Sequence, residues 1–199
     1  MNSQTKVAGV ILAGGRARRM NNQDKGLVKF KGRPMVSYAL AALVPVVDCV
    51  FINANRNIDQ YREFGWPVIS DQTDGFDGPL AGVLTAMIHA DADVLVVLPC
   101  DLPFIKTEHL QKLLSARAEN NVDVAVAFDG VRLHPVFFAV KTALQTSLQD
   151  YLAGDRRKVA TWLAQQNFVP VDFSYEPEIF SNINTMAELS VLEGVNRSS

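Results

Sequence analysis

The sequence has little cysteine, no long apolar run and no excess of either charge. Its two cysteines, Cys49 and Cys100, cannot build a disulfide framework or a four-cysteine zinc site, so we expect two buried thiols in a reducing compartment. No apolar run approaches the ~20 residues that cross a bilayer, and residues 1–6 lack the layout of a secretion signal. We therefore expect a cytoplasmic protein without a membrane partner.

Charge is nearly balanced, because 19 Lys and Arg stand against 21 Asp and Glu, for a net charge of −2. A protein that binds nucleic acid needs an extended cationic face, which this balance disfavours. Hydrophobic residues make up 48% of the 199 residues, a share that is typical of globular domains and argues against disorder. We therefore expect a globular protein with a substantial core and no nucleic-acid partner.

Short β-branched runs alternate with longer helical patterns along the chain. The runs at 7–12 and 94–98 contain no polar residue, which is typical of strands that helices cover on both faces. The alternation predicts an α/β fold with a doubly wound, mostly parallel, Rossmann-like sheet, and its short connections predict that residues 1–199 form a single domain. The other predicted strands are 49–53, 68–70, 122–128, 136–140 and 168–171, and the predicted helices are 34–43, 80–89, 107–118, 142–152, 158–165 and 185–192.

Ligands of such sheets bind beyond the carboxyl ends of the strands, so the residues after each strand are the candidates for a site. Gly14 and Gly15 follow the first strand, and glycines there leave backbone N–H groups uncovered, as an anion cradle requires. Residues 16–33 hold seven Lys and Arg against one acid, Asp24. This predicts a polyphosphate site, with a solvated basic loop as the alternative. The spacings of a Walker loop and of a dinucleotide fingerprint are both absent from the sequence.

Asp101 follows the strand at 94–98, at the open end of the predicted sheet. A carboxylate there is a natural anchor for Mg²⁺, which prefers oxygen ligands and bridges to substrate phosphates. The alternative is that Asp101 caps the next helix, although Thr107 suits that cap better. The sequence therefore predicts a metal site at Asp101.

Two other segments after strands carry groups that suit a nucleoside. A loop rich in glycine and proline ends in Pro79 and Leu80, which could press on one face of a base; an ordinary tight connection is the alternative. Residues 53–56, Asn-Ala-Asn-Arg, could contact a ribose or a base, or form a turn. His134 is either a structural histidine or a contact to a second substrate, whereas His89 and His109 have no paired ligand that would suggest a metal.

Several motifs resemble those of nucleotidyltransferases that activate small phosphorylated compounds. The first is Leu12-Ala13-Gly14-Gly15, with Arg19-Met20 and Asp24-Lys25 behind it. Over residues 7–192 the chain closely resembles the molybdenum cofactor guanylyltransferase family. The features that narrow the resemblance are Asn53, Asp71, residues 78–82, 99–103 and 154–157, and the pair Asn182 and Asn184.

The resemblance implies a Mg²⁺-dependent transfer of GMP from GTP to molybdenum-bound molybdopterin, which yields a guanine dinucleotide cofactor and pyrophosphate. It implies a nucleotide-binding N-terminal part and an acceptor-binding C-terminal part. It also suggests transient contact with proteins that deliver or accept the cofactor. By family likeness the GTP contacts fall on Leu12, Ala13, Gly14, Lys25, Asn53, Asp71 and Asp101, the last of which also falls on the metal.

Within this interpretation each charged group has an expected task. The amides of Gly14 and Gly15, together with Arg19, would contact the β- and γ-phosphates, and Lys25 the α-phosphate or the incoming phosphate. The second pKa of a phosphate monoester lies near 6, so the acceptor is already ionised and needs no general base. The candidate acceptor anchors are Arg156, within the basic cluster 156–158, and the amides of Asn182 and Asn184.

Three other functions remain open at this stage. A related enzyme could use CTP on the same pterin, or could activate another small phosphate, because few loop atoms decide the choice of base. A catalytically silent nucleotide-binding or cofactor-carrier protein is the alternative from a different class, and the presence of Lys25 and Asp101 argues against it.

Overall fold

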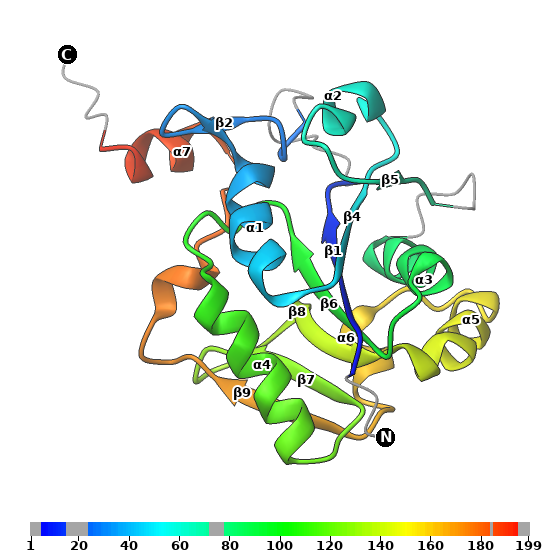
Figure 1. The fold of residues 1–199 in the computed structure, drawn as a ribbon. Coiled ribbons are helices and arrows are strands. Elements are labelled where there is room, and N and C mark those ends of the chain that lie inside the picture. Colours follow the sequence, from blue (N-terminus) through cyan, green and yellow to red (C-terminus); the bar gives the residue numbers. More distant parts are fainter. Residues whose placement is uncertain (1–4, 15–23, 72–77, 184, 195–199) are drawn as a thin grey trace.

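The computed structural model describes residues 5–14, 24–71, 78–183 and 185–194. Seven of its strands form one sheet in the order β5-β4-β1-β6-β8-β7-β9 (Figure 1). Pairing is parallel except on the two sides of β8, so the prediction of a mostly parallel sheet is confirmed. The strands are β1 Val7–Leu12, β4 Cys49–Asn53, β5 Val68–Ile69, β6 Val94–Pro99, β7 Val124–Phe128, β8 Leu133–Lys141 and β9 Phe168–Asp172.

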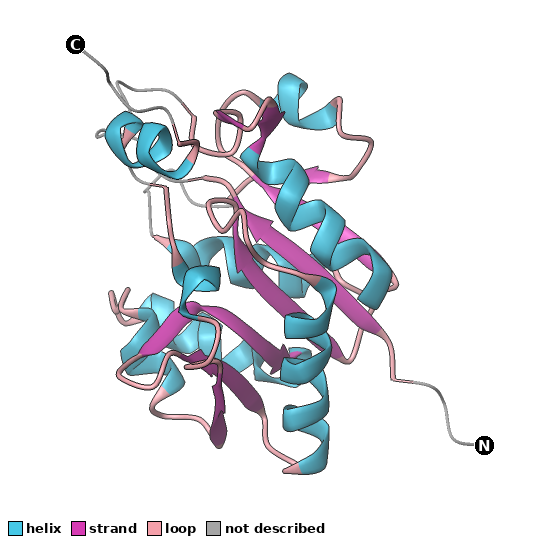
Figure 2. Ribbon diagram, turned by 90° about the vertical axis from the view of Figure 1, so that its left-hand side faces the viewer, coloured by secondary structure: helices cyan, strands magenta, loops and turns pink. Residues whose placement is uncertain are grey.

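Helices cover both faces of the sheet, as Figure 2 shows from the side. Two core clusters fill the two layers. One cluster joins the sheet to α1 and α4, and the other joins it to α3, α5 and α6. The helices are α1 Met35–Leu43, α2 Ile58–Arg62, α3 Pro79–His89, α4 Thr107–Glu119, α5 Gln145–Ala153, α6 Val159–Leu163 and α7 Met186–Leu192.

The central strands are apolar throughout because their alternate residues enter different cores. In β1, Ile11 belongs to the cluster under α1 and α4, whereas Val10 belongs to the cluster under α3. In β6, Val96 and Val97 divide in the same way, and all four side chains are fully buried. This two-sided burial holds β1 and β6 in the middle of the sheet and brings their carboxyl ends to one edge.

The structure differs from the sequence-based expectation in several local features. Lys106, not Thr107, is the N-cap of α4, and the Thr107 hydroxyl instead donates to the carbonyl of Ala42 at 3.1 Å. The predicted helix 142–152 begins as a 3₁₀ turn, Thr142–Leu144, before α5. Cys49 is half-buried, and only Cys100 of the two thiols is buried.

The hairpin of β2 (Lys29–Phe30) and β3 (Arg33–Pro34) was not predicted from the sequence. Its turn residues, Lys31 and Gly32, both have a positive φ, and lysine is an unusual residue in that conformation. No helix among the described residues is long and apolar enough to cross a membrane.

Candidate functional site

A cavity of about 460 Å³ opens where β1, β4 and β6 end. The last residues of these strands, Leu12, Asn53 and Pro99, all line it, so it lies at the carboxyl edge of the sheet. The structure thus brings together predicted site residues that are up to 170 positions apart in the chain. The lining residues are Leu12, Gly14, Asn53, Asn55, Asp71, Gly78, Pro79, Pro99, Asp101, Val136 and Asn182.

Lys25 and Asp101 form an ion pair in this site. Nζ of Lys25 lies 3.1 Å from Oδ2 of Asp101, and both side chains are largely buried. Lys25 precedes the β2–β3 hairpin, whereas Asp101 comes two residues after β6, so the fold brings the pair together from distant segments. A cation beside a carboxylate can bind a ligand that carries both phosphates and a metal.

The second oxygen of Asp101 has a different environment. Oδ1 is buried, and none of the described residues makes a hydrogen bond to it. A buried carboxylate oxygen without a donor is costly unless a ligand satisfies it, and a cation does so. The neighbouring thiol of Cys100 takes no part, because burial raises its pKa well above the usual value and keeps it protonated.

Asp71 is held in one orientation by two asparagine side chains. Nδ2 of Asn53 donates to Oδ1 of Asp71 at 2.9 Å, and Nδ2 of Asn55 donates to Oδ2 at 2.7 Å. Oδ1 of Asn55 in turn accepts the backbone N–H of Asp71 at 2.9 Å. The lone pairs that stay uncommitted on this carboxylate can accept hydrogen bonds from the donor edge of a base or from a ribose.

Two glycines give this asparagine pair its room. A Cβ on Gly14 would lie 3.1 Å from Nδ2 of Asn55. A Cβ on Gly82, in the first turns of α3, would collide with Oδ1 of Asn53 and lie 2.7 Å from its Cγ. Side chains at either position would press on the residues that orient Asp71.

Replacing Gly82 by alanine is therefore expected to displace the Asn53 amide and to weaken binding of the nucleotide that the sequence predicts for this site. The loss of one well-placed hydrogen bond to a charged group predicts about tenfold weaker GTP binding with the fold retained. Calorimetric titration with GTP, together with the unfolding temperature, measures both effects. Ile88→Ala at the exposed end of the same helix is the control, and equal affinities in the two variants would contradict the prediction.

Several predicted site residues lie elsewhere or beyond what the structure describes. Leu80 is fully buried in the core under α3, so only Pro79 of that pair faces the cavity. Ala13 is buried, and its N–H donates to the carbonyl of Asn53 at 2.8 Å. Gly15, Arg19 and Asn184 lie outside the described residues.

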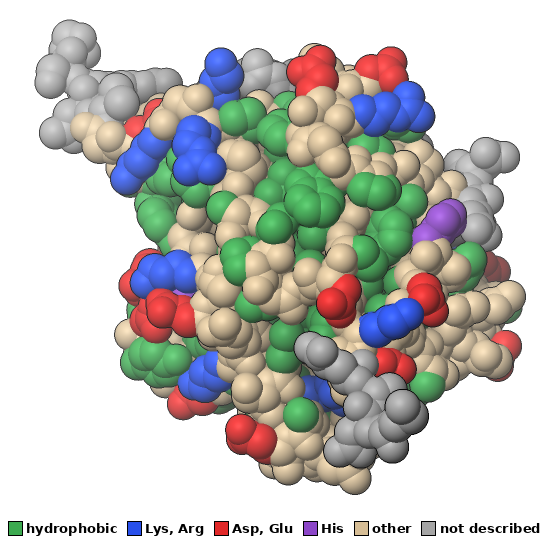
Figure 3. Space-filling view, viewed as in Figure 1, with side chains coloured by type: hydrophobic (Ala, Val, Ile, Leu, Met, Phe, Trp, Pro, Cys, Tyr) green, Lys and Arg blue, Asp and Glu red, His purple; other side chains and the backbone are tan. Residues whose placement is uncertain are grey.

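The described cations of the basic segment 16–33 do not all lie at the cavity. Lys29, Lys31 and Arg33 are exposed on the β2–β3 hairpin, and none of them lines the cavity. In Figure 3, Lys and Arg side chains (blue) lie separately on the surface at the side of the molecule where Figure 1 labels β2. The guanidinium of Arg33 packs over the ring of Tyr38 at 4.9 Å. Among the described cations of this segment, only Lys25 contacts a lining residue, Asp101.

Of the predicted acceptor anchors, one lines the cavity and another does not. Asn182 lines the cavity, beside Val136 of β8. Arg156 is not among the lining residues, and its guanidinium packs over the Tyr151 ring at 4.5 Å.

His134 has a structural environment. Its Nε2 lies 2.7 Å from Oδ2 of Asp129, and its ring stacks on Phe180 with centroids 3.7 Å apart. Hydrogen bonds from the Arg132 backbone, from His134 and from the Val131 backbone lower the pKa of Asp129, so the carboxylate stays charged. The stack supports the segment that carries Asn182 to the cavity.

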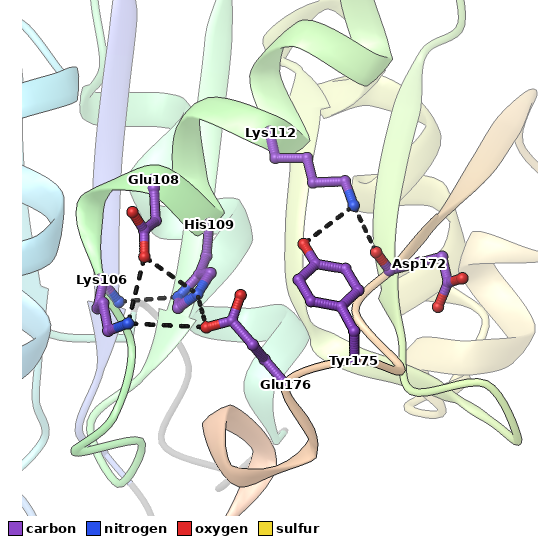
Figure 4. A network of polar contacts seen from close by, with 7 residues as sticks. All are labelled: Lys106, Glu108, His109, Lys112, Asp172, Tyr175 and Glu176. Carbon is purple, nitrogen blue, oxygen red and sulfur yellow. Dashed lines mark hydrogen bonds and ion pairs between the residues drawn. The ribbon is translucent and has the colours of Figure 1, made fainter.

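His109 lies beside two acidic side chains, although the sequence showed no paired ligand for it. Its Nε2 lies 3.2 Å from Oε2 of Glu176 and 3.9 Å from Oε1 of Glu108 (Figure 4). The three side chains are close enough to hold a metal. However, the backbone N–H of Lys106 donates to Nδ1 at 3.0 Å, so the neutral ring carries its proton on Nε2 and donates it to Glu176. The ammonium of Lys106 is also 3.2 and 3.7 Å from the two carboxylates, which leaves no place for a second cation.

The contact of His109 with Glu176, together with a second set of contacts made by Lys112, attaches α4 to the end of β9 and the chain that follows it. Lys112 donates to the carbonyl of Asp172 at 2.6 Å and to the hydroxyl of Tyr175 at 3.2 Å (Figure 4). The 3₁₀ helix η3, Pro177–Phe180, follows directly and leads to Asn182. The contacts fix the path of the segment that closes the cavity from the β8 side.

The burial of Asp24, beside Lys25, was not predicted from the sequence. Asp24 is only 7% exposed and accepts hydrogen bonds from the segment after β4. The sequence did contain an indication of its importance, because Asp24 is the one acidic residue in a segment, 16–33, that holds seven basic residues. The sequence predicts Asn55 only as part of a polar turn or as a contact to a ribose or a base. Its hydrogen bonds with Asp71 show that it orients this carboxylate.

The chain is similar to known proteins over most of its length. The model of the MobA-like NTP transferase domain family matches residues 9–169, which defines the protein as a nucleotidyltransferase. Molybdenum cofactor guanylyltransferases of Shewanella loihica and Shewanella baltica strain OS155 are each 45% identical to the chain. The first match covers 90% of this chain and 92% of the relative, and the second covers 93% of both. The chain belongs to the molybdenum cofactor guanylyltransferase family.

Solved structures share the fold at lower sequence identity. Molybdopterin-guanine dinucleotide biosynthesis protein A from Archaeoglobus fulgidus superposes with a TM-score of 0.77 at 23% identity, covering 94% of this chain and 97% of that one. A CMP:2-keto-3-deoxy-manno-octonic acid synthetase complexed with CTP has a TM-score of 0.73 at 16% identity, covering 96% and 98%. The sheet and its helices are thus shared with a molybdopterin-guanine dinucleotide biosynthesis protein and with a synthetase whose structure contains CTP.

Proposed function

We propose that this protein transfers GMP from GTP to molybdenum-bound molybdopterin, forming molybdopterin guanine dinucleotide and releasing pyrophosphate. The observation that carries the proposal is the Lys25–Asp101 ion pair at the carboxyl edge of the sheet, in a chain of this family. The pair supplies a cation and a metal-binding carboxylate at the point where a triphosphate would enter.

The nucleoside half of GTP would occupy the end of the cavity near β4. Asp71, oriented by Asn53 and Asn55, offers a carboxylate to the donor edge of the base or to the ribose, and Pro79 offers an apolar surface for one face of the base. The triphosphate would then extend past Gly14 towards Lys25, with contacts from Gly15 and Arg19 in the segment that follows. This placement separates the recognition of the base from the chemistry at the α-phosphate.

Mg²⁺ fits the carboxylate at the other end of the cavity. Oδ1 of Asp101 is buried, and none of the described residues donates a hydrogen bond to it. Its lone pairs are therefore available to coordinate a metal ion. Bound there, the ion would neutralise charge on the α- and β-phosphates and on the departing pyrophosphate. Asp101 is the residue that would hold it.

The protein's own residues would act mainly by offsetting charge. The terminal phosphate of the acceptor, already ionised at neutral pH, attacks the α-phosphorus in line with the departing pyrophosphate. Lys25 would stabilise negative charge between the two anions, while its ion pair with Asp101 keeps the ammonium in place. No general base is needed in this scheme.

The acceptor would bind on the β8 side of the cavity. Asn182 lines that side and can pair with the hydrogen-bonding edge of a pterin, and Asn184 and Arg156 are the further proposed anchors. The N-terminal part of a single domain would thus bind GTP and its C-terminal part the acceptor. Transient contact with proteins that deliver or accept the labile cofactor belongs to the same proposal.

Pyrophosphate release with GTP, CTP, ATP and UTP, each in the presence of the molybdenum cofactor and Mg²⁺, tests the function. We expect release with GTP and little with the other three nucleotides. Preference for CTP would make the protein a cytidylyltransferase instead. Tight GTP binding without turnover in the complete mixture would favour a nucleotide or cofactor carrier.

A further inference from the structure

Asp24 is a buried carboxylate that the proposed chemistry does not use. Only 7% of the residue is exposed. Tyr61 donates its hydroxyl to Oδ1 at 2.5 Å, and the backbone N–H of Gly26 donates to the same oxygen at 3.3 Å. Nδ2 of Asn57 donates to Oδ2 at 3.0 Å, and Nε of Arg56 lies 3.6 Å from that oxygen. Every one of these partners is a donor.

Because donors surround both side-chain oxygens of Asp24, a carboxylate fits this position better than an amide. An asparagine in the same volume has one acceptor oxygen and one NH₂ group. Whichever way its amide turned, the NH₂ group would face donors: either Gly26 N–H, or the side chains of Asn57 and Arg56. A buried charge with this many partners is stabilised, whereas an NH₂ group placed against donors destabilises its surroundings.

Tyr61 stays a donor to Asp24 under ordinary conditions. The side chain is fully buried at the end of α2. Burial, with the nearby acidic groups, raises the pKa of its phenol well above the usual value, so the hydroxyl keeps its proton. Tyr61 therefore supports the negative charge of Asp24 rather than competing with it.

The network connects two separate parts of the chain. Tyr61, Asn57 and Arg56 belong to the segment after β4, whereas Asp24 and Gly26 stand on either side of Lys25. The Asp24 carbonyl also accepts the N–H groups of Leu27 at 3.0 Å and Val28 at 3.1 Å, which forms a tight turn around Lys25. The backbone on both sides of Lys25 is thus tied to one buried carboxylate.

Gly26 shows how close this contact is. A Cβ at position 26 would collide with the hydroxyl of Tyr61. The turn that carries Lys25 therefore packs against α2 without a side chain between them. Such packing leaves the Lys25 backbone little freedom to move away from the cavity.

We infer that Asp24 is a positioning residue, whose carboxylate holds the turn around Lys25 so that the Lys25 ammonium stays on Asp101 and in reach of the nucleotide phosphates. Asp24 acts only through Lys25 and touches no substrate itself. The inference rests on the proposed role of Lys25 in transfer. It assigns the single acid of the basic segment to preorganisation of the site.

A double-mutant cycle between Asp24→Asn and Lys25→Ala tests the inference. Turnover with saturating GTP and the temperature of unfolding are measured for the wild type, both single variants and the double variant, well below the lowest unfolding temperature. We expect Asp24→Asn to lower turnover about tenfold in the wild-type background and less than about twofold in the Lys25→Ala background. The decrease in unfolding temperature, by contrast, is expected to be the same in both backgrounds. Asp59→Asn, an exposed change on α2, is the matched control with wild-type turnover.

The cycle separates the failure of each idea. If Lys25→Ala lowers turnover but Asp24→Asn does not, or lowers it equally in both backgrounds, the positioning role is overturned and the function of Lys25 stands. If Lys25→Ala turns over like the wild type, the proposed role of Lys25 fails and the inference falls with it. Should Asp24→Asn not fold, Tyr61→Phe removes one donor and keeps the carboxylate. Its smaller loss of turnover, about threefold, must likewise vanish in the Lys25→Ala background.

Discussion

Replacement of Asp101 by asparagine is expected to lower turnover of GTP by about 100-fold or more, the effect of removing one preorganised stabiliser of developing charge. The amide has the same volume but carries no charge, so it binds Mg²⁺ poorly. It also leaves the Lys25 ammonium, 3.1 Å away, without its counterion. Steady-state release of pyrophosphate across a range of Mg²⁺ concentrations measures the loss.

Asp91→Asn is the matched control for this variant. Asp91 is an exposed carboxylate that pairs with Lys6 at the opposite end of β6, far from the cavity. We expect wild-type turnover and the same Mg²⁺ dependence in the control. Near-normal turnover of Asp101→Asn with the Mg²⁺ dependence of the wild type would remove Asp101 from the proposed mechanism.

Lys25→Ala is expected to lose a similar factor, at least about 100-fold in turnover, with an unchanged fold. The reason is that two polyanions must approach each other at the α-phosphorus, and Lys25 is the one described cation of the basic segment in contact with a lining residue. Single-turnover measurements with saturating GTP isolate the transfer step from product release. Lys25→Arg keeps the charge but replaces a compact ammonium by a larger planar group, and we expect only partial recovery.

Lys29→Ala provides the comparison at an exposed lysine of the same basic segment. Lys29 lies on the hairpin and does not line the cavity. If removal of Lys29 lowered single-turnover rates as much as removal of Lys25, the effect would come from the general field of the basic segment. The specific role of the ion pair with Asp101 would then be wrong.

The parts of the fold that the sequence predicts well are those with a two-sided pattern of burial. Val10 and Ile11 are both fully buried because they enter opposite cores, and such a run has no other place than the middle of a covered sheet. Because β1 and β6 are neighbouring parallel strands, the residues that follow them, Gly14 and Asp101, lie at the same edge of the sheet. The general position of the site follows from that.

Pairings across long stretches of chain could not be predicted in the same way. His109 meets Glu176 across 67 positions, and Asp24 meets Tyr61 across 37, and no local periodicity records either contact. Leu80 follows Pro79 and has the same apolar character, yet the direction of the first turn of α3 sends it into the core and leaves Pro79 at the cavity. These details depend on how the helices and loops pack against the sheet.

A crystal structure of the protein with GTP and Mg²⁺ would show whether one ligand occupies both Lys25 and Asp101. We expect the triphosphate to lie between Gly14 and Lys25, the metal to be bound by Asp101, and the base to lie beside Pro79 and Asp71. The proposed site would be wrong if the triphosphate bound at another surface, or if other residues held the metal while Asp101 kept only Lys25 as its partner.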